Sequence, residues 1–206
     1  MTISEIYSHF DIPPNLQRHM FEVTAVADVI CENWQGPQID RGLIIQGCLT
    51  HDLGNIVKFK RPFWGELQDK LEYWENAQDE IIQKYGSDTF TVTQKMMEEI
   101  SVDKKIRELL VFVKAVVDLP DKEHSWEARI VEYADDWVSP EGIIGIKKRL
   151  DDLAIRYPNE PQSSWDAMKK NAEVVQPFIK IDLSSLSPQE WALRIEKMKQ
   201  VDIKIT

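Results

Sequence analysis

Four positions carry side chains whose types and spacing could bind a metal ion: His19, the adjacent pair His51 and Asp52, and Asp135. Each lies on an apolar stripe with helical spacing, so each is expected to point toward the interior of a helical protein. His19 shares its stripe with four apolar residues, Val23, Val26, Ala27 and Ile30. Polar groups are therefore directed inward from three separate segments.

The other two segments repeat this arrangement. His51 and Asp52 stand at the end of an apolar stripe that precedes them. Asp135 shares a face with Ala128, Val131 and Val138, whereas its neighbour Asp136 is turned about 100° away around the helix. Asp135 is therefore the residue expected to face inward.

A buried carboxylate destabilises a protein by several kcal/mol unless it is paired or bound to a metal. Two imidazoles and two carboxylates suit one divalent ion, with Mn²⁺, Fe²⁺, Ni²⁺, Co²⁺, Mg²⁺ and Zn²⁺ all compatible. Because the set has no cysteine, an open site that holds water is favoured over a closed structural zinc site. The alternative is that each residue is an ordinary hydrogen-bonded core residue, since a single inward histidine is more often that than a ligand.

The elements that must position these residues are almost all helical. Helical spacing and capping signals predict helices over residues 15–34, 40–52, 64–85, 91–100, 104–118, 123–138, 142–157, 163–179 and 188–201. We therefore expect an all-α fold, a single helical bundle over residues 1–160 with a C-terminal helical extension, 161–206, packed on it. Residues 181–190 are expected to connect to a terminal arm whose removal would spare the chemistry.

Three segments together resemble the HD superfamily of metal-dependent phosphohydrolases, whose pattern is H…HD…D on successive helices. The matching text is RHMFEVTAVADVI, QGCLTHDLGNIVKF and ARIVEYADDWVSP. The resemblance spans roughly residues 15–140. It implies that His19, His51, Asp52 and Asp135 bind one metal ion in an all-helical domain, with water completing the coordination shell.

The chain also departs from patterns found in that superfamily. Members with two metals carry two further histidines between the doublet and the last aspartate, whereas this chain has His124 alone. A single-metal site is therefore favoured, with His124 near a helix cap or at the surface. Some nucleotidase members have a glutamate soon after the doublet, where this chain has Asn55. The general base is thus open, with Asp52 or a metal-bound hydroxide in that role.

Basic residues follow the doublet in an otherwise acidic protein. Lys58, Lys60 and Arg61 fall within four residues, and Arg18 adjoins His19. Such cations can bind phosphate and stabilise charge that develops on its oxygens. Lys58, Arg61 and Arg18 are therefore predicted to bind substrate. A solvated basic loop is the alternative for Lys60 and Arg61.

Composition limits the remaining classes. The chain has 206 residues and a net charge of −10, which argues against a dedicated nucleic-acid binder. It shows neither an apolar run long enough for a membrane helix nor a signal peptide, so no membrane partner and a cytoplasmic location are expected. Cys31 and Cys48 are expected to be reduced core thiols. The regions around Trp165 and Trp191 are candidates for a homodimer contact.

The expected activity is hydrolysis of a phosphate ester or phosphoanhydride in a small molecule by a metal-activated water. A nucleotide is the favoured substrate, on the habits of the superfamily alone. A metal-binding and nucleotide-binding sensor that does not turn its ligand over is the alternative, because of Asn55. A purely structural helical module would leave the inward polar residues unexplained.

Overall fold

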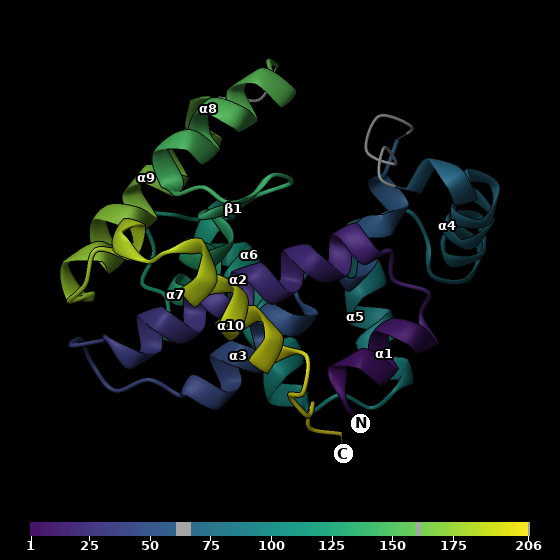
Figure 1. The fold of residues 1–206 in the computed structure, drawn as a ribbon, viewed down its shortest axis with the longest axis horizontal. Helices are drawn as coiled ribbons and strands as arrows, with labels where there is room; N and C mark the ends of the chain where they lie inside the picture. Colours follow the sequence, from purple (N-terminus) through teal and green to yellow (C-terminus); the bar gives the residue numbers. More distant parts are fainter. Residues whose placement is uncertain (61–66, 160–161, 206) are drawn as a thin grey trace.

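The computed structural model describes residues 1–60, 67–159 and 162–205, with the backbone alone at Ser164. These residues form ten α-helices and one two-stranded hairpin, which confirms the all-α prediction (Figure 1). The helices are α1 Ile3–His9, α2 Pro14–Glu32, α3 Arg41–Thr50, α4 Leu71–Tyr85, α5 Thr89–Glu99, α6 Lys104–Asp118, α7 Trp126–Asp135, α8 Ile146–Arg156, α9 Gln162–Val175 and α10 Pro188–Met198. Short 3-10 segments are η1 Leu53–Lys58, η3 Gln176–Phe178 and η4 Leu183–Ser185. Within the described ranges, no helix combines the length and apolar character needed to cross a bilayer.

Helix α2 is the central element of the bundle. It packs against α3, α7 and α10, and α10 crosses it in Figure 1. Residues 20–30 of α2 are buried all round the helix, including the polar Glu22, Thr24 and Asp28. A helix without a solvent face belongs to the centre of a domain. The first of the inward histidines, His19, therefore stands on a helix at the centre of the domain.

The prediction of one helix over residues 142–157 is wrong at its start. Residues Gly142 and Ile143 form strand β2, which pairs antiparallel with β1, Val138–Ser139, and α8 begins only at Ile146. Gly142 and Gly145 have φ values of 114° and 84°, a backbone region that breaks a right-handed helix and that glycine adopts readily. The same hairpin ends α7 at Asp135, earlier than the expected 138.

Helix α1 was not expected from the sequence. Thr2 begins it with a capping box, in which Glu5 N donates to Thr2 Oγ1 and Thr2 N donates to Glu5 Oε2. Its residues Ile3, Ile6 and Tyr7 are buried. A helix of seven residues is too short to display a repeated apolar period. The helix predicted from residue 64 begins at Leu71, and positions 64–66 lie outside the described residues.

The C-terminal segment packs closely on the rest of the chain. Arg194 of α10 donates to Asp28 Oδ2 at 3.0 Å and to Glu32 Oε2 at 2.7 Å, and Arg41 also bonds the buried Asp28. Trp191 is 9% exposed, so the expectation that this residue is exposed is wrong, while the homodimer itself stays a prediction.

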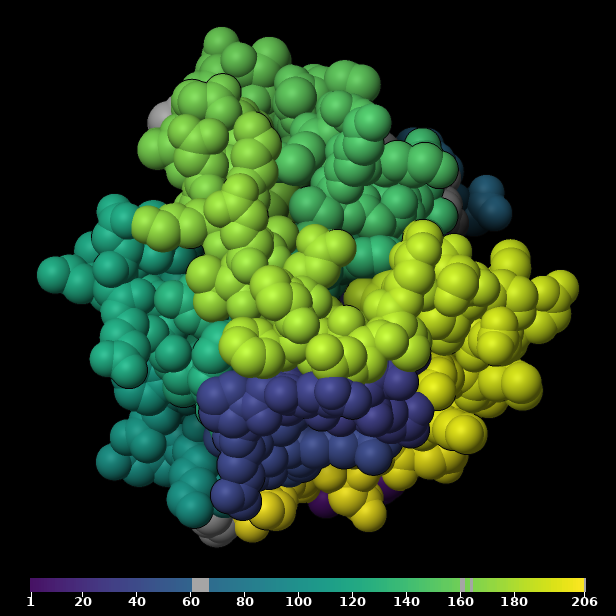
Figure 2. Space-filling model, turned by 90° about the vertical axis from the view of Figure 1, so that its left-hand side faces the viewer, coloured from purple at the N-terminus to yellow at the C-terminus, as the bar shows by residue number. Residues whose placement is uncertain are grey.

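The two chain ends meet at one side of the bundle (Figure 1). Ile3 N donates to Val201 O at 3.1 Å, and Ile203 N donates to Met1 O at 2.9 Å. Figure 2 shows the chain after α9 lying against the surface near the end of α2, where Lys180 N donates to Asn33 O. Removal of the terminal arm would unpair these backbone groups, and its effect on the chemistry stays a prediction.

Candidate metal centre

Three helices deliver the side chains predicted to bind metal. His19 projects from α2, Asp135 is the last residue of α7, and His51 follows directly after the end of α3. Asp52 comes next and leads into η1. Because α2 packs against both α3 and α7, the three helices bring the separated residues together.

The donor atoms of His19, His51 and Asp135 lie within 4.8 Å of one another. His19 Nε2 is 3.0 Å from Asp135 Oδ1, and His51 Nε2 is 3.6 Å from the same oxygen. Among the described residues, neither His51 Nε2 nor Asp135 Oδ1 has a hydrogen-bond partner, although both atoms are buried. Two buried polar atoms that converge without a bond point to a missing shared partner.

Asp52 lies beside this group of three. Its Oδ2 is 3.6 Å from His19 Nε2 and 3.7 Å from His51 Nε2. The side chains of Asp52 and Asp135 are 22% and 30% exposed, whereas that of His51 is 9% exposed, so both carboxylates are more open to solvent than His51. The structure thus assembles all four residues. Its tightest set is His19, His51 and Asp135, and Asp52 remains a prediction as a ligand.

The spacing suits a shared cation. Nitrogen and oxygen ligands of divalent transition metals lie about 2.0–2.2 Å from the ion, which puts two ligands of one ion about 3.0–4.4 Å apart. The distances of 3.0, 3.6, 3.6 and 3.7 Å fall in that range. His51 Nδ1 lies 2.7 Å from Cys48 O, and a carbonyl only accepts, so Nδ1 is the donor. This bond aims Nε2 at the site, as the bond made by the second nitrogen of a ligating histidine does.

The electrostatics of the cluster are those of tightly paired groups. Burial alone would lower the pKa of His51, but the charges of Asp52 and Asp135 and the Cys48 carbonyl outweigh it and raise that pKa to about 9. Burial would likewise raise the pKa of Asp135, yet the adjacent imidazoles of His19 and His51 hold it well below its usual value. In the absence of a metal ion, the protonated His51 thus supplies a positive charge beside Asp52 and Asp135.

Further carboxylates surround the cluster, and the sequence reasoning missed them. Burial, followed by the charge of Asp135, raises the pKa of Glu132 to about 8. Asp136 is 6% exposed, and burial with the charges of Glu132 and Asp135 raises its pKa well above the usual value. The prediction that Asp136 turns away from the core is wrong: α7 ends at Asp135, and Asp136, its C-cap residue, is buried. Glu132 could have been found by its spacing, one turn before Asp135.

The turn after the doublet is held in place by α5. Gly54 N donates to Thr93 Oγ1 at 2.9 Å, and a Cβ at Gly54 would lie 2.3 Å from Thr89 O and 2.7 Å from Thr93 N. Only glycine allows this approach between η1 and α5. Asn55, in the position of the expected glutamate, is 8% exposed.

The predicted cations are placed less closely. Arg18 Nη2 donates to Pro140 O at 3.3 Å, and Lys58 ends η1 with an exposed side chain. Arg61 lies outside the described residues, so its predicted role is untouched by the structure. His124 precedes the N-cap Ser125 of α7, and its Nε2 lies 2.8 Å from Leu119 O.

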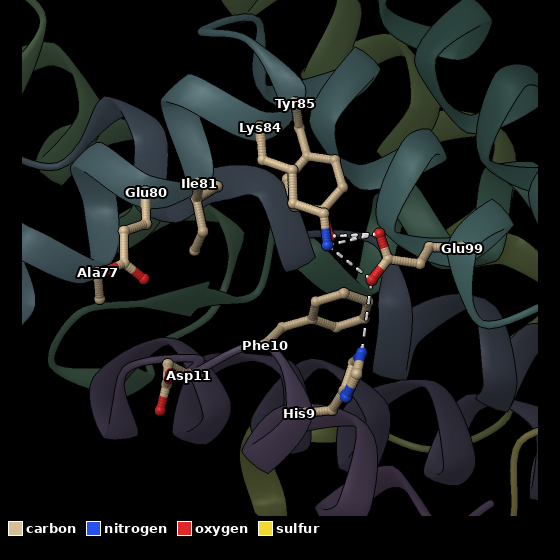
Figure 3. Close-up of a pocket in the computed structure, with 9 residues that line it drawn as sticks. All are labelled: His9, Phe10, Asp11, Ala77, Glu80, Ile81, Lys84, Tyr85 and Glu99. Atoms are coloured by element: carbon tan, nitrogen blue, oxygen red, sulfur yellow. Dashed lines mark hydrogen bonds and ion pairs between the residues drawn. The ribbon is translucent and has the colours of Figure 1, made fainter.

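A separate cavity of about 180 Å³ lies where α1, α4 and α5 meet. Figure 3 shows Lys84, Tyr85 and His9 directed at Glu99 in this cavity, and Tyr85 Oη donates to Glu99 Oε2 at 2.8 Å. The carboxylate of Glu99 is therefore already paired. None of the metal-cluster residues lines this cavity.

Comparison with known proteins adds no relative: a scan against protein-family models matches no family, and searches of curated proteins and of solved structures return no match. What the chain does must therefore be inferred from its own residues.

Proposed function

We propose that this protein is an HD-type metal-dependent phosphohydrolase that hydrolyses a phosphate ester or phosphoanhydride in a small molecule, with a nucleotide as the favoured substrate. The observation that carries the proposal is the convergence of His19, His51 and Asp135, in which buried His51 Nε2 and Asp135 Oδ1 form ion-pair contacts but no hydrogen bond to any residue that the structure describes. The order of these residues and the His51-Asp52 doublet fit the HD pattern. The choice of a nucleotide rests on the resemblance alone, because fold-level analogy is a weak guide to substrate.

The residues divide the work by position. His19, His51 and Asp135 would hold one divalent ion, whose chemistry is to lower the pKa of a water and to polarise a phosphoryl oxygen. Asp52 lies beside these three, with its Oδ2 3.6 Å from His19 Nε2, where its carboxylate could bind the ion or accept the proton of the attacking water. Arg18 and Lys58 are assigned to phosphate oxygens, and Arg61 is assigned with them from the sequence.

A sensor is the second candidate function. Asn55 occupies the position where some nucleotidase members carry a glutamate that activates water, and an amide cannot accept that proton. The same residues would then bind metal and a phosphorylated ligand without turnover. The role of Asp52 distinguishes the two functions, because the enzyme requires a base to activate water and the sensor does not.

The test begins with metal content, measured by elemental analysis of the purified protein. His51→Ala should lose the metal, whereas His124→Ala, which removes an imidazole outside the cluster, should keep it. Identical metal content in wild type and His51→Ala would refute the site.

Phosphate release is then measured on nucleotides, cyclic nucleotides and sugar phosphates with Mn²⁺, Co²⁺, Ni²⁺ or Mg²⁺. Asp52→Ala should abolish release, and Asp79→Ala, on an exposed face of α4, should leave it unchanged. Stabilisation by a nucleotide without release would favour the sensor. No response to any compound would refute both functions.

A further inference from the structure

Tyr7 is a buried polar residue that the proposed activity does not use directly. It stands on α1 and is 1% exposed, and its hydroxyl donates to Leu49 O at 2.7 Å across 42 residues of sequence. Leu49 lies two residues before His51, in the last turn of α3. A buried hydroxyl so placed bonds the backbone that carries the metal-binding doublet.

The end of α3 needs such partners. The last four carbonyls of a helix have no amide of the same helix to bond them. Cys48 O is bonded by His51 Nδ1 at 2.7 Å, a partner from its own turn. Leu49 O instead receives its bond from Tyr7, which belongs to a different helix. Tyr7 therefore fixes this turn relative to the rest of the bundle, which the local bond of His51 cannot do.

Helix α1 is itself held at both ends. At its start, Ile3 N donates to Val201 O and Ser4 Oγ donates to Lys199 O, each at 3.1 Å. Near its end, the ring of Tyr7 packs edge-on against Phe21 of α2, with centroids 5.4 Å apart. Through its ring, Tyr7 thus contacts α2, the helix that carries His19. Through its hydroxyl, it contacts the end of α3, the helix that precedes His51.

We infer that Tyr7 is a positioning residue of the metal centre, whose hydroxyl sets the last turn of α3 so that His51 and Asp52 meet His19 and Asp135. The inference rests on the proposed metal site. Ligands must be held within about 0.5 Å for productive binding, and removing a group that orients a ligand weakens metal affinity by about 10–100-fold. Tyr7 contacts none of the four residues through a hydrogen bond that fixes a side chain, so it acts through the backbone.

The test compares Tyr7→Phe with Tyr85→Phe. Phenylalanine fills the same volume as tyrosine, so the core around position 7 stays packed and the chain folds. Tyr85→Phe removes a hydroxyl of the same kind from the cavity of Figure 3, away from the metal centre. Each purified metal-free protein is titrated with Co²⁺, followed by visible absorption, and its thermal midpoint is measured without metal.

Tyr7→Phe should weaken Co²⁺ binding by about tenfold or more and alter the Co²⁺ absorption bands, while Tyr85→Phe should bind as wild type does. A lowered thermal midpoint with unchanged Co²⁺ affinity would show that Tyr7 is merely structural and would overturn the inference. Absence of Co²⁺ binding in wild type would instead overturn the proposed metal site, and the role of Tyr7 with it. The two failures are therefore distinguishable.

Discussion

Binding of a divalent cation should release the proton that His51 carries in the metal-free protein. The pKa of His51 is raised to about 9, so at pH 7 only about one molecule in a hundred has a neutral imidazole able to bind metal. Displacing this proton at pH 7 costs about 2.7 kcal/mol, the free energy of two pKa units. The apparent dissociation constant for Mn²⁺ should thus fall about tenfold from pH 7 to pH 8.

The assay is calorimetric titration with Mn²⁺ in buffers of equal pH and different ionisation enthalpies. The dependence of the measured heat on buffer ionisation gives the protons released per ion, which should be about one from His51 at pH 7. Glu132, whose pKa is about 8, adds a further fraction that Glu132→Gln should remove. Tight binding with no proton release and no change of affinity with pH would refute this electrostatic reasoning.

The same proton affects the stability of the metal-free fold. Because the pKa of His51 is higher in the folded than in the unfolded chain, its contribution is complete below about pH 6.5 and is lost as pH rises through about 9. The shift of about 2.5 pKa units corresponds to at most about 3.4 kcal/mol. Urea unfolding of metal-free protein should therefore give a lower free energy of unfolding at pH 9 than at pH 6. Equal or greater stability at pH 9 would contradict this sign.

Three further predictions concern the surroundings of the site. Gly54→Ala should lower the free energy of unfolding by roughly 1–3 kcal/mol and weaken Mn²⁺ binding, because its Cβ would meet the backbone of α5, whereas Gly42→Ala should be tolerated. Arg194→Ala should lower the free energy of unfolding in urea by about 1–3 kcal/mol, since Asp28 keeps only Arg41 as a charged partner. Glu132→Gln should raise the thermal midpoint of the metal-free protein at pH 9 more than at pH 5, because the pKa of Glu132 is about 8 and its charge is buried only above that pH.

The long helices could be predicted because their apolar residues repeat over several turns. Helix α6 matches the predicted residues 104–118, and α2 differs from 15–34 by one or two residues at each end. Helix α1 is too short for a period to show, and the hairpin at Val138–Ile143 depends on glycines with positive φ inside an otherwise helical pattern. Local spacing therefore recovers the bundle but not its short connecting elements.

The convergence of His19, His51 and Asp135 could be predicted because polar groups on apolar stripes are visible in the sequence. Tyr7 could not, because its bond to Leu49 depends on how α1 packs, 42 residues away. Asp136 shows the limit of the same reasoning: it lies off the stripe of Asp135, yet it is buried where α7 ends. A helical wheel shows the faces of one helix and does not show what packs at its end.

The carboxylates around the cluster explain why a cation and a phosphate should bind together. Asp52, Asp135, Glu132 and Asp136 gather in one region of a protein whose net charge is −10. The charge of Arg149 lowers the pKa values of Glu132 and Asp136. Its Nη1, however, already donates a hydrogen bond to Asp152 Oδ2 at 3.0 Å. The raised pKa values of Glu132 and Asp136 favour their neutral forms, so a phosphate approaching the metal-free site at neutral pH would meet the two charges of Asp52 and Asp135, which outweigh the single positive charge of His51 and repel it. A divalent ion on His19, His51 and Asp135 offsets the two negative charges of Asp52 and Asp135, so a nucleotide should raise the thermal midpoint when Mn²⁺ is present and leave it unchanged when a chelator removes the metal.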